Sequence, residues 1–173
     1  MKQLLQMKQL KIITPLIFTT LLSACGNKVQ SINTDMNRTE NLIFAKGKKI
    51  ENDNFTGTAW LNSLVDADST NQNAVGSVTF EPGARTKWHS HPAGQIILAL
   101  DGVGYYQEKG KEKVIVRKGE VVKCPINVPH WHGASADTAF VQIAITGREK
   151  GETVWLEPVS DKEYYGGQKE RQP

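Results

Sequence analysis

The histidines of this chain gather in two pairs, and each pair is separated by a single residue. The pairs read His89-Ser90-His91 and His130-Trp131-His132. Successive side chains of a β-strand point to opposite faces, so both members of an extended pair share one face. Gln95 returns to the face of the first pair if the extended geometry holds through the bend at 92–94. Two imidazoles and an amide oxygen then converge, His130 adds a third imidazole, and such donors suit a mid-row divalent metal ion.

Two questions stay open at this point. The histidines could instead be satisfied wall residues of a barrel that holds no metal. His132 lies two residues beyond His130 and therefore on the same face. It can act as a further ligand, as an acid or base with an ordinary pKa near 6.5, or as a neighbour that only positions the ligands.

Short apolar stretches with turn residues between them surround the histidines. The predicted strands span 55–64, 75–80, 94–100, 104–107, 113–116, 120–124, 139–145 and 154–156, with turns at 81–83, 101–102, 109–111, 118–119 and 146–147. A single helical turn is expected at 161–165. Short strands at regular spacing predict an all-β sandwich or barrel, and the chain has no phosphate-binding glycine loop.

Residues 1–24 resemble the signal peptide of a bacterial lipoprotein. A start with three lysines precedes an apolar run at 12–22. The run is followed by small residues and a cysteine, in the sequence Leu22-Ser23-Ala24-Cys25. The run is too short for a comfortable membrane span. We expect lipidation of Cys25, which would anchor the protein in the bacterial cell envelope. In a bacterium with two membranes, we expect the anchor to lie in the outer membrane. An uncleaved anchor and an ordinary signal are the alternatives, and the repeat at Met1 and Met7 offers two starts.

The rest of the chain is expected to form one domain. A polar tether covers 25–41, the domain covers 42–166, and a tail covers 167–173. The net charge of +3 includes the signal lysines, and no basic stripe indicates nucleic-acid binding. The segment Lys109–Lys113 is predicted to be a solvated hairpin tip, and Cys124 a buried small hydrophobe rather than a nucleophile.

The two histidine segments resemble the two motifs of the cupin superfamily. The first motif is matched by Gly83, His89, His91 and Gly102, with Gln95 where most members carry Glu. The second is matched by Gly119, Pro125 and His130, with Asn127 in place of Gly and Ala134 in place of Asn. Asn tolerates the left-handed backbone region, so the turn survives the exchange. The resemblance implies a conical, jelly-roll β-barrel, and we expect a homodimer that covers edge strands.

A narrower resemblance covers most of the domain. The segments 55–58, 78–91, 129–134 and 155–164 are similar to bacterial cupin-type hydroxynitrile lyases. In that family a manganese ion is held by three His and one Gln, which implies His89, His91, Gln95 and His130 here. Iron, zinc, nickel and cobalt are the alternative metals. The family carries a further His on a late strand where this chain has Gln142, which can donate a hydrogen bond but cannot take a proton.

The resemblance implies reversible loss of cyanide from a cyanohydrin, or a related cleavage of a hydroxy compound, to give a carbonyl compound. A neutral Gln95 in place of Glu leaves more of the metal's positive charge to polarise a substrate oxygen. His132 would then move the proton, and Gln142 would orient the substrate or leaving group. The alternatives are an iron dioxygenase of the quercetinase type and a non-catalytic module that binds a small molecule through its metal.

Overall fold

The computed structural model describes residues 42–169 of the 173-residue chain. The predicted signal peptide, the tether and Cys25 lie outside the described residues. Within the described part, no helix is long and apolar enough to cross a membrane.

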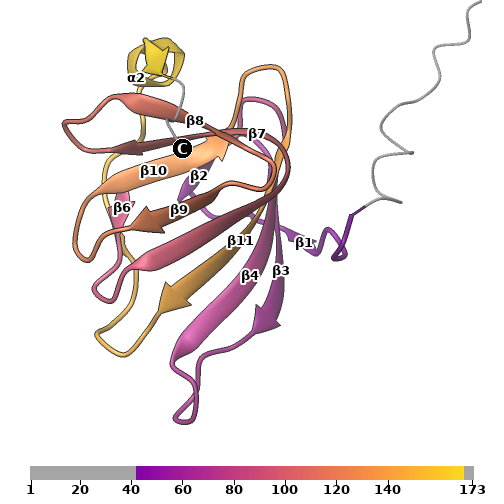
Figure 1. Ribbon diagram of the computed structural model, residues 1–173, viewed down its shortest axis with the longest axis vertical. Coiled ribbons are helices and arrows are strands. Elements are labelled where there is room, and N and C mark those ends of the chain that lie inside the picture. The colour runs from indigo at the N-terminus through magenta and orange to yellow at the C-terminus, as the bar shows by residue number, and fades with distance from the viewer. Residues whose placement is uncertain (1–41, 170–173) are drawn as a thin grey trace, which may run out of the picture. The chain divides into compact units, whose positions relative to one another are not determined.

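The strands of the described part join into one curled, 13-stranded sheet with two halves (Figure 1). The first half contains β1 (Lys48–Lys49), β3 (Ala59–Val65), β4 (Asn73–Phe80), β11 (Phe140–Gly147) and β9 (Val121–Cys124). The second contains β2 (Phe55–Thr56), β5 (Arg85–Thr86), β6 (His89–Ser90), β8 (Lys113–Arg117), β10 (His130–Ala134), β12 (Val154–Trp155) and β13 (Gln168–Lys169). The long strand β7 (Gln95–Glu108) belongs to both halves. This arrangement, with antiparallel pairing in all but β13–β8, confirms the predicted all-β jelly-roll barrel.

The expected turn at 101–102 is absent, because both residues lie within the continuous strand β7. Val141 of β11 pairs with Asp101 and Gln142 pairs with Ala99, so Leu100 is an extra residue in β7. Gly102 has φ +76°, and a Cβ there would lie 1.8 Å from a backbone oxygen of Ala139. The glycine therefore makes a β-bulge rather than a turn, and the strand bends from one half of the sheet to the other.

Other segments also differ from the sequence prediction. The residues expected as a turn at 146–147 are instead the end of β11. The predicted strand 55–64 is divided into β2 and β3 by Gly57, whose φ is +78°. Part of the segment expected as a tail forms β13, which pairs in parallel with β8. The helical turn is found as predicted, as α2 (Asp161–Tyr165), and it begins with a capping box between Ser160 and Glu163.

Two apolar clusters hold these elements together. The interior of the barrel is filled by residues from both halves of the sheet: Ala59, Val78, Phe80, Ala84, Ile97, Ala99, Tyr106, Val116, Val122, Cys124, Ala134 and Phe140. On the opposite face of the second half, Trp88 and Trp131 pack with Val159 and Tyr164 around α2. Because strand neighbours alternate, the tryptophans of the two histidine segments fix α2 while the histidines face inward.

The hairpin between β7 and β8 is only partly solvated, contrary to the expectation for Lys109–Lys113. Lys113 is buried, and its Nζ donates to the backbone oxygen of Tyr164. The ammonium also lies 4.5 Å from the ring centre of Tyr105. An aromatic ring and a carbonyl therefore replace water around Lys113, and this contact attaches the end of α2 to the barrel.

Candidate metal centre

Strand pairing brings the two histidine segments into contact. His89 of β6 pairs directly with His130 of β10. His132, two residues along β10, lies on the same face and pairs with Tyr106 of β7. The register places His89 and His130 side by side, so the local alternation of each segment becomes a shared cluster.

The histidines converge inside the barrel. One ring nitrogen of each of His89, His130 and His132 lies within 4.8 Å of the others, and all three side chains are buried. His91 is beside them, with its ring centre 5.0 Å from that of His89 and 5.4 Å from that of His130. The tightest group thus contains His132 rather than His91, although all four predicted rings are adjacent.

Hydrogen bonds direct the histidine nitrogens toward one another. His89 and His130 each place Nδ1 2.9 Å from a backbone oxygen, of Lys87 and Val128. A carbonyl only accepts, so Nδ1 carries the proton and Nε2 keeps its lone pair. His91 Nε2, His130 Nε2 and His132 Nδ1 are buried without a hydrogen-bond partner. Buried polar atoms are normally paired, so these nitrogens fit a divalent metal ion as the missing partner.

The electrostatics also favour metal ligation. Burial lowers the pKa of His89 and of His132 well below 6.5, and the neighbouring histidines lower both further. Burial lowers the pKa of His91 to about 3, with smaller contributions from His130 and Arg148, and it lowers the pKa of His130. All four rings are therefore neutral at pH 7, which is the form that binds metals.

Gln95 begins β7 and borders the same cavity. Its Nε2 donates to Thr146 Oγ1 at 2.9 Å, while its Oε1 has the weak thiol donor of Cys124 at 3.9 Å. The hydrogen bond to Thr146 thus fixes the orientation of the amide, and the amide oxygen remains able to bind a metal ion. Cys124 is buried, as predicted, and burial raises the pKa of its thiol to about 12.

Gln142, on β11, lines the same cavity. Its side chain is fully buried, and neither its Nε2 nor its Oε1 has a hydrogen-bond partner. An unsatisfied buried amide costs on the order of 1–3 kcal/mol. A polar ligand group that pairs with Gln142 would recover this cost.

A cavity of about 220 Å³ connects these groups. The predicted site residues that line it are His89, His91, Gln95, His132 and Gln142, whereas His130 is not among the lining residues. The other lining residues include Phe55, Val78, Phe80, Thr86, Thr146, Arg148, Thr153 and Trp155. Arg148 and Thr153 were not expected at the site, since they follow β11 without a motif. Trp155 was expected only as part of the segment 155–164 that is similar to the lyases.

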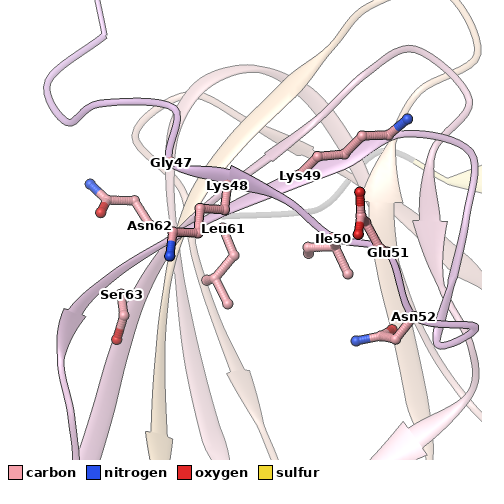
Figure 2. A pocket seen from close by; sticks show the side chains of 9 residues that line it. All are labelled: Gly47, Lys48, Lys49, Ile50, Glu51, Asn52, Leu61, Asn62 and Ser63. Carbon is pink, nitrogen blue, oxygen red and sulfur yellow. The ribbon is translucent and has the colours of Figure 1, made fainter.

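A larger hollow of about 630 Å³ lies at the edge of the sheet between β1 and β3. Figure 2 shows that one side is formed by Leu61, Asn62 and Ser63 and the other by Ile50, Glu51 and Asn52. None of its lining residues is a histidine or cysteine. The buried histidine cavity is therefore the better candidate for chemistry, despite its smaller volume.

Comparisons with known proteins agree with this fold. Residues 76–146 match the model of a cupin domain. The chain is 42% identical to the (R)-mandelonitrile lyase of Granulicella tundricola over 111 residues, which are 64% of this chain and 85% of the relative.

Solved structures give the same result. A cupin-like protein from Thermotoga maritima is 46% identical, with a TM-score of 0.69, and the match covers 72% of this chain and 95% of that protein. A predicted oxalate decarboxylase from the same organism is 19% identical, with a TM-score of 0.53 over 69% of this chain and 97% of that one, and it shares the fold alone. The barrel, the paired histidine segments and these relatives together place the chain in the cupin superfamily, with resemblance to mandelonitrile lyase.

Proposed function

We propose that this protein is a metal-dependent lyase that reversibly cleaves a cyanohydrin, or a related hydroxy compound, to a carbonyl compound. The observation that carries the proposal is the buried group of His89, His130 and His132, whose nitrogens converge beside a cavity. The 42% identity to a mandelonitrile lyase supports the reaction class.

The proposed ligands are His89, His91, Gln95 and His130, with manganese as the expected ion and iron, zinc, nickel or cobalt as alternatives. A bound divalent ion supplies Lewis acidity toward a substrate oxygen. The donor set contributes no negative charge, since its members are neutral imidazoles and an amide. Thr146 holds the Gln95 amide, and backbone carbonyls hold the rings of His89 and His130.

The proton steps are assigned to His132. Its ring is neutral at pH 7, because burial lowers its pKa well below 6.5, and the neutral form is the one that can accept a proton. In the cleavage direction His132 takes the hydroxyl proton, the carbon–carbon bond to the nitrile breaks, and the electron pair leaves with cyanide. His132 then returns the proton to give hydrogen cyanide. The unpaired Nε2 of Gln142 donates a hydrogen bond to the leaving group or substrate.

The test combines metal analysis with an activity assay. Protein purified without chelator is expected to contain a divalent metal and, once loaded, to release benzaldehyde from mandelonitrile. His130→Ala is the matched control, and it should lose both metal and activity. No benzaldehyde with manganese, iron, cobalt, nickel or zinc would contradict the lyase proposal. Activity that appears only in Gln142→His would then show that this chain has moved to another substrate, and dioxygen uptake would favour the dioxygenase.

Two further features are proposed from the sequence. The lipid anchor at Cys25 places the domain in the bacterial cell envelope, and it predicts that wild-type protein partitions into detergent while Cys25→Ala does not. Mature wild-type protein that is fully soluble and retains residues 1–24 would contradict the anchor. The homodimer is tested by light scattering at micromolar concentration, where the mass of a single chain would count against it.

A further inference from the structure

One charged side chain stands out at the cavity. Among the described residues that line it, Arg148 is the one arginine, and there is no lysine, aspartate or glutamate. The cavity wall therefore carries a positive charge without a carboxylate of its own to balance it.

Hydrogen bonds hold Arg148 against the histidine group. Its Nη1 donates to Thr153 Oγ1 at 3.1 Å, and the same oxygen lies 3.2 Å from His91 Nδ1. Arg148 is thus close enough to the proposed metal ligands for one small molecule to contact both.

The protein's own partner for this arginine is weakly held. Glu152 Oε2 lies 2.8 Å from Arg148 Nη1, but the Glu152 side chain is 86% exposed. Exposed ion pairs contribute little to stability, because water and salt screen them and both side chains lose freedom. A guanidinium has five N–H donors, and these contacts use only Nη1. A ligand carboxylate can therefore pair with Arg148 beside Glu152 or in its place.

Three aromatic rings form one part of the cavity wall, which also carries polar side chains such as Thr86 and Thr146. The ring centre of Trp155 lies 5.9 Å from that of Phe55 and 4.9 Å from that of His89. The ring centre of Phe80 lies 5.9 Å from that of Phe55, so the three aromatic rings form a continuous surface. Such a surface suits a planar or branched apolar group.

We propose that the natural substrate carries a carboxylate that pairs with Arg148, and an aryl or alkyl group that packs on Phe55, Phe80 and Trp155. The substrate class is thus a small apolar hydroxy compound, such as a cyanohydrin, that bears a carboxylate in addition to the group that leaves. The carboxylate contact depends only on the cavity, whereas the cleavage of such an acid rests on the lyase function proposed above.

Calorimetric titration with mandelate and with its neutral analogue mandelamide tests the charge preference. The two ligands share the ring and hydroxyl and differ in the carboxylate. Wild-type protein should bind mandelate at least about tenfold more tightly, as expected for a charge-assisted pair, and the preference should shrink at high salt. Because metal ions also bind carboxylates, the titration is run on metal-loaded and on metal-free protein.

Variants separate Arg148 from other sources of the preference. Arg148→Gln should abolish the preference in metal-free protein and reduce it in loaded protein, and Arg148→Lys should retain part of it. Glu152→Gln should strengthen mandelate binding severalfold by removing the competing carboxylate. Lys150→Gln, which removes an exposed charge outside the lining, is the matched control and should change nothing. Thermal melting confirms that each variant is folded.

Equal affinity for mandelate and mandelamide in metal-free wild-type protein would overturn the proposal, as would an unchanged preference in folded Arg148→Gln. These outcomes are independent of the lyase assay. Loss of metal binding or of benzaldehyde release would instead contradict the proposed function and leave the carboxylate preference to be read from the metal-free titration.

Discussion

At the scale of single residues, the main question is how the four histidines divide the work. The motif assigns His91 to the metal, whereas the tightest group of ring nitrogens contains His132. We expect Ala at His89, His91 or His130 to abolish tight metal binding, because water does not replace a lost imidazole with comparable affinity.

His132→Ala is expected to keep near-normal metal content and to lose roughly a hundredfold or more in turnover, the scale for removing a general base. Metal analysis and steady-state kinetics on the same preparations make the comparison. If His132→Ala empties the site while His91→Ala stays loaded, then His132 is the third imidazole ligand and its proton-transfer role is lost.

Gln95 offers a second prediction at this scale. Gln95→Glu should retain or tighten metal binding, because a carboxylate adds negative charge to the donor set. The same charge should reduce polarisation of the substrate oxygen and slow cleavage. Metal affinity from competition with a chelator, compared with turnover, separates the two effects. Faster turnover with unchanged affinity would contradict this account of why an amide stands there.

At the scale of elements, the turn between β9 and β10 joins the two histidine segments. Asn127 has φ +58°, the one positive φ of a non-glycine residue in the described chain, as predicted where the motif has Gly. Its backbone N–H donates to the oxygen of His91 at 3.0 Å, and the next residue, Val128, accepts from His130 Nδ1. The turn thus positions one histidine of each pair.

Asn127→Ala should therefore lower the free energy of unfolding by about 1–2 kcal/mol, the cost of left-handed backbone for a residue with a Cβ. Asn127→Gly should be neutral within about 0.5 kcal/mol, because glycine adopts this conformation freely. Urea denaturation of the metal-free proteins measures both, with Gly as the matched control. Equal loss in both variants would instead assign the effect to contacts of the Asn side chain.

At the scale of the whole molecule, four buried neutral histidines make the stability of the metal-free protein depend on pH. Each pKa is lower in the folded than in the unfolded chain, mainly through burial. At pH values between the unfolded pKa near 6.5 and the lower folded pKa values, the unfolded chain binds more protons than the folded chain. The folded pKa of His91 is about 3. The contribution is complete above pH 6.5, and stability should fall as the pH decreases from there.

Thermal melts of metal-free protein between pH 8 and pH 4 check this expectation. Bound metal should raise the melting temperature at neutral pH and make the loss on acidification steeper, because protons and metal compete for the same nitrogens. A melting temperature that stays constant from pH 7 to pH 4 without metal would contradict the burial of neutral rings.

Local sequence determined much of this protein. Alternation along a strand is set by the backbone, so the spacing of the histidine pairs was enough to predict that both members of each pair share one face. Turn chemistry was equally local, as Asn127 and the cap of α2 show. The Asp101–Gly102 pair misled the prediction, because a glycine with positive φ serves a bulge as well as a turn, and the partner strand β11 decides between them.

Only the tertiary structure decided what surrounds the histidines. Pairing of β12 with β6 brings Trp155 beside His89, and the return of the chain after β11 brings Thr153 to His91. Arg148 belongs to no motif, and its charge matters because its carboxylate partner, Glu152, is exposed and lies outside the cavity lining. The spacing of ligands is a property of neighbours in sequence, whereas the charge and shape of a cavity depend on strands that meet only when the barrel closes.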